Sequence, residues 1–198
     1  MFGGGVAVPP GGPADTLSRL ISPKLSEAMG QAIVIDNRAG ANGNIGTDMV
    51  AKAPADGYTL LMAFDATMVI NPSAYAKLPF DPVKDLAPIT PAGLPVNVLN
   101  VHPSLPVKNV KEFIALAKSK PNELNYGSAG NGSGGHLFTA MFGSMAGVKL
   151  LHIPYRGASF ATTAVLSGET IFMFDNIVTT LPLARANKLR ALAVTTAR

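Results

Sequence analysis

The residues best suited to chemistry lie in two glycine-containing loops, each placed just before an expected helix. The first loop is Pro9-Pro-Gly-Gly-Pro-Ala-Asp15 and the second is Gly130-Asn-Gly-Ser-Gly-Gly135. Glycine lets the backbone approach a ligand closely, and free N–H groups at a helix N-terminus attract an anion. Both loops are therefore candidate anion sites. The alternatives are a glycine turn that only closes on itself and, for Asp15, a first-turn acid that complements the helix dipole.

The second loop also matches the GxGxxG pattern of dinucleotide-binding proteins. That pattern needs an acidic residue about 20 positions further on to bind the ribose. The neighbourhood of Tyr155 contains no acidic residue before Glu169. A nucleotide-binding α/β enzyme is therefore an alternative rather than the preferred interpretation, and no cofactor is expected.

Ser133 and His136 make a serine hydrolase a second alternative. The GxSxG pattern of such enzymes fails, because Asn131 stands two residues before Ser133. A serine and a histidine three residues apart at one helix start also rarely reach the geometry for proton transfer. We therefore expect no catalytic residues, and we expect His136 beside a ligand or as a satisfied histidine at the helix end.

Asp175 and Asn176 directly follow an expected apolar strand, residues 171–174. Parallel sheets place ligand-binding groups at the carboxyl ends of their strands, so both residues are candidates for a ligand site. A cap for the next helix is an equally supported alternative.

The composition argues against several classes of protein. Charged residues make up 14% of the 198 residues, the net charge of +4 is scattered, and 47% of the chain is hydrophobic. A stripe of basic residues for nucleic acid is missing, so nucleic acid is not an expected partner. The chain has no cysteine, and its histidines, at positions 102, 136 and 152, lack the spacing of a zinc site. We therefore expect no metal.

Residues 86–107 form the longest uncharged stretch, but five prolines (Pro88, Pro91, Pro95, Pro103 and Pro106) interrupt it. A continuous transmembrane helix is not expected there. Residues 1–8 lack the positive and long apolar regions of a signal peptide. The expectation from the residues is a cytoplasmic chain, or a chain given without its leader.

Hydrophobic periodicity predicts alternating strands and helices. The expected strands are residues 5–8, 32–36, 58–64, 96–101, 124–126, 149–153, 170–174 and 189–195. The expected helices run from Asp15 to Gly30, over 47–52, from a cap at Asn109, and over 136–145, 159–166 and 176–187. The βαβαβ order of the first half is typical of a parallel sheet covered by helices.

Six motifs occur in order along the chain: PPGGPADTL (9–17), IDNRAGANGNIG (35–46), DGYTLL (56–61), YGSAGNGS (126–133), IPYRG (153–157) and MFDN (173–176). Together they resemble the Bug family, the extracytoplasmic solute receptors of tripartite tricarboxylate transporters. The resemblance implies a two-lobed α/β periplasmic-binding-protein fold of the Venus flytrap type II. It also implies a periplasmic protein that closes around a small organic carboxylate and delivers it to the membrane components of the transporter.

The resemblance further implies residues 1–100 as the first lobe and 101–198 as the second. Family chains usually continue beyond the segment that matches residues 189–197 and return to the first lobe, so the first lobe is expected to be incomplete. The implied ligand-binding residues lie in a cleft between the lobes. They are Gly12, Pro13, Ala14, Asp15, Asp65 and Thr67 in the first lobe, and Ser128, Ala129, Gly130, Gly132, Ser133, Gly134, Gly135, His136, Asp175 and Asn176 in the second.

Asp65 departs from the family pattern, which usually has glycine and small hydroxyl residues in this loop. A carboxylate beside an anionic ligand repels it, unless the ligand also carries a cation. An amino-acid-like ligand would reconcile Asp65 with the glycine loops. The alternative is an Asp65 that faces solvent or caps a short helix.

Overall fold

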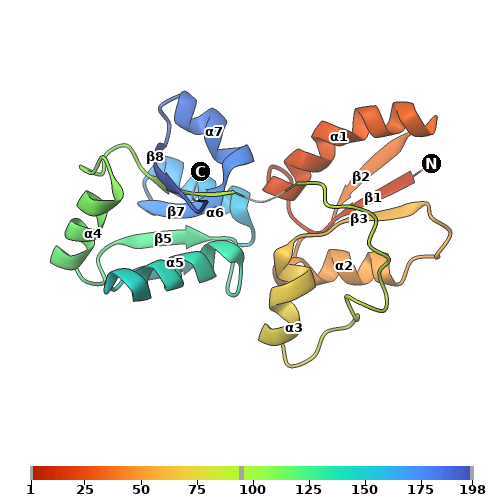
Figure 1. The fold of residues 1–198 in the computed structure, drawn as a ribbon, viewed down its shortest axis with the longest axis horizontal. Helices are drawn as coiled ribbons and strands as arrows, with labels where there is room; N and C mark the ends of the chain where they lie inside the picture. The colour runs from red at the N-terminus through yellow and green to blue at the C-terminus, as the bar shows by residue number, and fades with distance from the viewer. Residues whose placement is uncertain (1, 94–95, 197–198) are drawn as a thin grey trace. The chain divides into compact units, whose positions relative to one another are not determined.

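The computed structural model describes residues 2–93 and 96–196, and its backbone contacts divide the chain into residues 1–93 and 94–198. We call these unit 1 and unit 2 (Figure 1). The expected division lay between residues 100 and 101. The strand β4 (Asn97–Val101) pairs with two strands of unit 2, so residues 97–100 belong to that unit.

Unit 1 contains a parallel sheet with helices on both faces, as the βαβαβ order predicts. β1 (Phe2–Val6) lies between β2 (Ile33–Asn37) and β3 (Thr59–Met62). α1 (Pro13–Met29) connects β1 to β2, and α2 (Asn44–Ala51) connects β2 to β3. The two connections run in opposite directions along the sheet, so right-handed crossovers place the helices on opposite faces. Figure 1 shows α1 on one side of the sheet and α2 on the other.

Short helical turns complete the regular structure of unit 1. These are η1 (Ala41–Gly43), the π-helical turn η2 (Ala66–Ile70) and α3 (Asn71–Ala74). Asn71 is fully buried, and its side-chain amide donates to the carbonyl oxygen of Asn42 at 3.0 Å and to Oδ1 of Asn44 at 2.7 Å. These bonds connect the end of η2 to the glycine-rich loop before α2.

Unit 2 contains a mixed sheet in the order β6-β5-β7-β4-β8. The further strands are β5 (Asn125–Ser128), β6 (Leu151–Pro154), β7 (Phe172–Asn176) and β8 (Arg190–Val194). β5 runs parallel to β6 and β7, and β4 runs antiparallel to β7 and β8. The carboxyl ends of β5, β6 and β7 therefore lie at one edge of the sheet.

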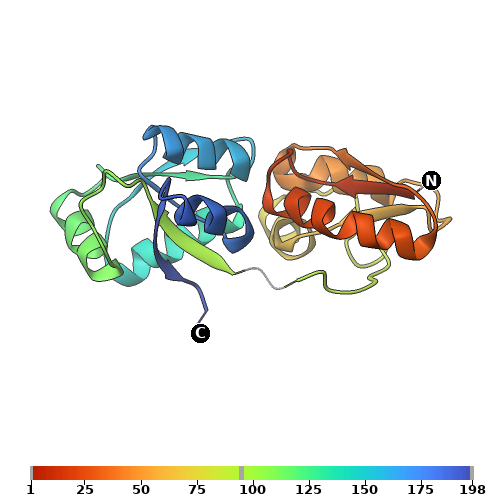
Figure 2. The ribbon, with the colours of Figure 1, turned by 90° about the horizontal axis from the view of Figure 1, so that it is seen from above.

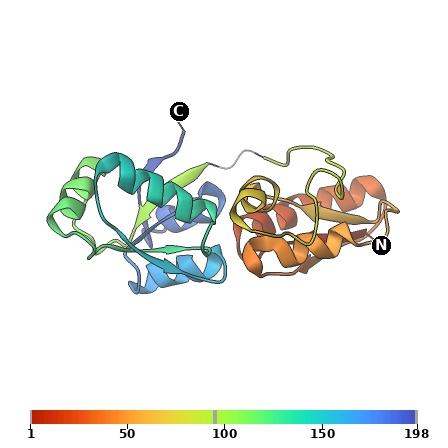
Figure 3. The same ribbon diagram turned by 90° about the horizontal axis from the view of Figure 1, so that it is seen from below.

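Two helices cover each face of this sheet. α4 (Val110–Ser119) and α5 (Gly134–Ala146) pack on one face, and α6 (Ala158–Ser167) and α7 (Ile177–Arg185) on the other. Figures 2 and 3 show the teal α5 and the light-blue α6 on opposite sides of the strands. Side chains of β7 alternate between the two faces: Phe172 and Phe174 join the cluster with Phe113 of α4, and Met173 joins the cluster with Ala161 of α6.

Gly46 allows α2 to lie directly against the sheet. A Cβ atom at this position would be 2.7 Å from the Cα atom of Ala7 and 2.8 Å from the carbonyl oxygen of Arg38. Both neighbours are backbone atoms, so they cannot move aside as a flexible side chain would.

We predict that Gly46→Ala destabilises unit 1 by about 1–3 kcal/mol, the usual cost of overpacking. Inside an unobstructed helix the same substitution would stabilise by roughly 1 kcal/mol, so the sign of the change is informative. Urea denaturation measures it. Gly93→Ala is the control, because its added methyl group meets no atom closer than 4.0 Å. A Gly46→Ala protein more stable than the wild type would contradict the prediction.

Candidate ligand-binding site

The glycine loop of unit 2 forms the N-terminus of α5. β5 ends at Ser128, and Ser133 is the N-cap of α5. The helix begins at Gly134, two residues before the predicted start at His136. The Ser133 hydroxyl donates to the carbonyl oxygen of Gly130 at 2.7 Å and accepts from the N–H of His136 at 3.4 Å. Gly130 and Gly132 have φ angles of 127° and 75°, in the left-handed region that favours glycine. The loop therefore needs glycine at these two positions to reach the helix start.

Two N–H groups at this helix end are free to bind an anion. Gly134 and Gly135 are the first two residues of α5, and their N–H groups have no hydrogen-bond acceptor within residues 2–93 and 96–196. The 13-residue helix adds a partial positive charge at the same end. A Cβ at Gly135 would be 2.9 Å from the carbonyl oxygen of Phe174, so glycine is also required there for contact with β7.

Ser128 pairs with a histidine that the sequence analysis did not select. Its Oγ lies 2.6 Å from Nε2 of His152 and 3.1 Å from both the nitrogen and the oxygen of Gly130. The two residues are 24 positions apart, on the neighbouring strands β5 and β6. No sequence pattern indicated this pair; only the parallel pairing of the strands reveals it.

The residues considered for a hydrolase serve other purposes. The Ser133 hydroxyl caps α5, and Nδ1 of His136 accepts from the N–H of Gly132 at 3.1 Å, so these side chains do not form a proton-transfer pair. Ser128 does have a histidine partner, but Ser128 itself is only 1% exposed. A substrate has no access to its hydroxyl.

His152 stacks on two other rings. Its ring centroid is 4.2 Å from that of His136, with an interplanar angle of 5°, and 4.8 Å from that of Tyr126, with an angle of 19°. Two rings cannot stack on the same face of an imidazole, so His136 and Tyr126 lie on opposite faces of His152. Burial, and then the charge of His136, lower the pKa of His152 from 6.5 to about 4. The His152 imidazole is therefore neutral at pH 7.

Asp175 is buried on the other face of the sheet, between α6 and α7. Its Oδ2 lies 3.1 Å from Oγ1 of Thr162 and 2.8 Å from Oγ1 of Thr179, and its Oδ1 accepts from the N–H of Asn176 at 2.8 Å. Burial raises the pKa of Asp175, and the bonds from Thr179, Asn176 and Thr162 only partly offset this.

Both threonine hydroxyls that contact Asp175 also contact the backbone. Each threonine hydroxyl also lies 2.9 Å from a backbone carbonyl, that of Ala158 for Thr162 and that of Asn176 for Thr179. Each threonine hydroxyl thus divides its single proton between Oδ2 of Asp175 and a backbone carbonyl oxygen. Asn176 caps α7 by accepting from the N–H of Val178 at 3.0 Å, which is the capping alternative considered from the sequence.

The first-loop residues of unit 1 surround the N-terminus of α1. Gly12 is the N-cap, and Pro13 and Ala14 are the first helical residues. Asp15 is 2% exposed and accepts from the N–H of Gly11 at 2.9 Å, from Nε of Arg19 at 3.0 Å and from Nδ2 of Asn37 at 3.0 Å.

These bonds make Asp15 a charged centre of the loop. Burial alone raises its pKa, but the bonds from Arg19, the Gly11 N–H and Asn37 outweigh burial, and the net pKa is lowered. Arg19 and Asn37 were not among the residues predicted from the sequence. Arg19 could have been found, because it stands four residues after Asp15 on one helix. Asn37 carries no such signal, because it joins the loop from the end of β2.

Asp65 and Thr67 lie in the turn after β3. Asp65 is exposed, and its Oδ1 accepts from the N–H of Ala66 at 2.9 Å, so it caps η2. Thr67 is fully buried and donates to the carbonyl oxygen of Phe64 at 3.1 Å. The geometry of Asp65 is that of the solvent-facing, capping alternative, and its contact with a ligand remains a prediction.

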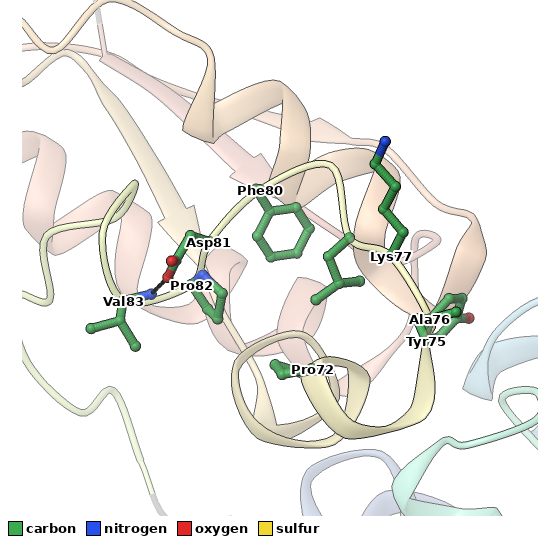
Figure 4. A pocket seen from close by; sticks show the side chains of 9 residues that line it. Pro72, Tyr75, Ala76, Lys77, Phe80, Asp81, Pro82 and Val83 are labelled. Carbon is green, nitrogen blue, oxygen red and sulfur yellow. Dashed lines mark hydrogen bonds between the residues drawn. The ribbon is translucent and has the colours of Figure 1, made fainter.

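An open pocket of about 440 Å³ lies in unit 1 beside α3 (Figure 4). Its lining comes from residues 72–83, and Lys77 and Asp81 are the charged residues in it. Oδ1 of Asp81 accepts from the N–H of Val83 at 3.0 Å. None of the predicted ligand-binding residues lines this pocket.

The described ranges 2–93 and 96–196 contain no group of three or more histidine, aspartate or glutamate side chains that could hold a metal ion. In the same ranges we find no helix with the length and apolar character needed to span a membrane.

Comparison with solved structures defines the class of the fold. The structure of Rpa4515 of R. palustris with adipate superposes with a TM-score of 0.93 at 39% identity, over 100% of this chain and 66% of that one. MatC of Rhodopseudomonas palustris with bound malate gives a TM-score of 0.90 at 29% identity, over 100% of this chain and 67% of that one. The fold is that of the periplasmic binding proteins, as expected.

Comparison of sequences gives the family. The model of the tripartite tricarboxylate transporter family receptor matches residues 17–198. BugT of Bordetella pertussis is 36% identical over 190 residues, which cover 96% of this chain and 58% of BugT. The chain belongs to this receptor family, which confirms the resemblance to Bug proteins and decides against the two enzyme alternatives. It spans little more than half the length of the curated relatives it matches.

We predict that the free energy of unfolding falls as the pH decreases from 6.5 to about 4, partly through His152. The unfolded chain binds a proton at this histidine in that range and the folded chain does not, so lowering the pH favours unfolding. His152→Phe should reduce the slope, as measured by urea denaturation at several pH values. His102→Phe is the control, and equal slopes in the two variants would contradict the prediction.

We also predict that Asp175→Asn is at least as stable as the wild type at neutral and mildly alkaline pH. A carboxyl group whose pKa is raised by folding contributes stability at low pH and loses it as the pH rises. The amide stays neutral, and it can accept from Asn176 and donate to the threonines. Thermal unfolding measured across this range tests the prediction, with the exposed Glu123→Gln as the charge control. An Asp175→Asn protein that is unfolded at every pH would refute it.

Proposed function

We propose that this protein is a periplasmic solute-binding protein that binds a small dicarboxylate and delivers it to the membrane components of a tripartite tricarboxylate transporter. Family membership supports the role of receptor and the extracytoplasmic location. The two similar structures with adipate and malate support a carboxylate ligand.

The observation that carries this proposal is the pair of free N–H groups at Gly134 and Gly135. In the proposed complex they donate to one carboxylate of the ligand, and the partial charge of α5 adds to the attraction. Charge-assisted hydrogen bonds of this kind contribute about 1.5–3 kcal/mol each. This strength is sufficient to select an organic acid over its neutral analogues.

The other predicted residues differ in what they can offer a ligand. Ser133 and His136 lie in the first turn of α5, next to the free N–H groups. Ser128, Ala129, Gly130 and Gly132 shape the loop before it. Both oxygens of Asp175 are already hydrogen-bonded, so we assign it to the packing of α6 and α7 rather than to direct contact. The ligand contacts of Gly12, Pro13, Ala14, Asp15, Asp65, Thr67 and Asn176 stay predictions.

Isothermal titration calorimetry with adipate and with malate tests the function. We expect the wild type to bind at least one of the two acids, and Gly134→Val to weaken that binding about tenfold or more, because the branched side chain obstructs the N–H groups. Ser144→Val, an exposed position in the same helix, is the matched control. Unchanged affinity in Gly134→Val, or an equal loss in both variants, would exclude the proposed placement.

A further inference from the structure

We propose that His152 is a positioning residue for the carboxylate-binding end of α5, and that it acts through the Ser128 hydroxyl. This inference rests on the proposed function, because it assigns His152 a role in building the same site. His152 lies on β6, outside the glycine loop, and no motif in the sequence singles it out.

The Ser128 hydroxyl has a single proton to donate. Two acceptors compete for it, Nε2 of His152 at 2.6 Å and the carbonyl oxygen of Gly130 at 3.1 Å. The Gly130 oxygen already accepts from the N–H of Ser133 at 3.1 Å and from the Ser133 hydroxyl at 2.7 Å. A carbonyl oxygen has two lone pairs, so these two bonds occupy it. The Ser128 proton therefore goes to His152, along the shorter contact.

Hydrogen bonds continue from Ser128 into α5. While its hydroxyl donates to Nε2 of His152, the Ser128 oxygen accepts from the N–H of Gly130 at 3.1 Å. Gly130 in turn anchors Ser133, and Ser133 caps the helix that presents the N–H groups of Gly134 and Gly135. An unbroken series of bonds thus runs from His152 to the proposed carboxylate site.

Two aromatic rings hold the imidazole of His152 in place. Tyr126 and His136 stack on its two faces, and both belong to elements that carry the loop, β5 and α5. His136 also binds the N–H of Gly132 through Nδ1, so the loop is attached at Gly130 and again at Gly132. Nε2 can accept only while His152 is neutral, which agrees with its lowered pKa of about 4.

Two substitutions distinguish the effect of the hydrogen bond between His152 and Ser128 from the effect of the stacked His152 ring. His152→Phe keeps an aromatic ring between Tyr126 and His136 but removes the acceptor for Ser128. His152→Gln removes the ring, but its side-chain oxygen can reach the position of Nε2 and accept the same bond. A structural role of the ring alone predicts that Phe is tolerated and Gln is not; the positioning role predicts the reverse.

The first measurement is amide hydrogen exchange of the intact chain without ligand. We expect exchange at Gly130 and Gly132 to be about fivefold faster or more in His152→Phe, the effect of one lost hydrogen bond, and close to the wild-type rate in His152→Gln. His102→Phe, in the same unit, is the control. Unchanged exchange in His152→Phe, or equal acceleration in both variants, would overturn the inference.

The second measurement is calorimetry with adipate and malate on the same proteins. We expect the affinity to fall about fivefold or more in His152→Phe and to be retained in His152→Gln. If the wild type binds neither acid, the proposed function fails, whereas the exchange rates still decide the role of His152. If the wild type binds and His152→Phe binds equally well, only the inference about His152 fails.

Discussion

The carbonyl oxygen of Gly130 is the acceptor on which the end of α5 depends. It accepts from both the N–H and the hydroxyl of Ser133, and this fixes the N-cap and with it the direction of the first helical N–H groups. The constraint demands a left-handed backbone at Gly130, where φ is 127°, and a Cβ there would be 3.3 Å from the carbonyl oxygen of Tyr155. Glycine satisfies both conditions. The conformation of the loop and the direction of the first helical N–H groups therefore have one common origin.

The alternation of side chains along the strands of unit 2 separates two polar groups that the chain places at one sheet edge. Ser128 ends β5 on the face covered by α5, where its neighbours are aromatic rings and glycine backbone. Asp175 comes one residue before the end of β7 and points to the face of α6 and α7, where two threonine hydroxyls and a backbone N–H surround it. The Ser128 hydroxyl bonds to the glycine loop before α5, whereas the Asp175 carboxyl group joins two helices.

In unit 1 a buried carboxylate fixes the conformation of the glycine loop. There the buried Asp15 carboxylate accepts hydrogen bonds from the loop backbone, from Arg19 on the same helix and from Asn37 at the end of β2. A charged centre of this kind holds the loop by electrostatics, while the loop of unit 2 is held by hydrogen bonds to hydroxyl groups and imidazole rings. The two loops look alike in sequence because both need glycine and a helix start.

The order of the strands and of the longer helices, the parallel pairing in unit 1 and the location of the glycine loops followed from the sequence alone, whereas the short turns η1, η2 and α3 were not among the expected helices. They depend on local signals, which are hydrophobic periodicity, glycine at positions of positive φ and caps such as Asn109, whose side chain accepts from the N–H of Glu112. The pairing of Ser128 with His152, the contact of Asn37 with Asp15 and the place of β4 between β7 and β8 were decided only by the tertiary structure. Each of these contacts joins segments more than 20 residues apart in the sequence. No local sequence pattern indicates which distant strand becomes the neighbour of another.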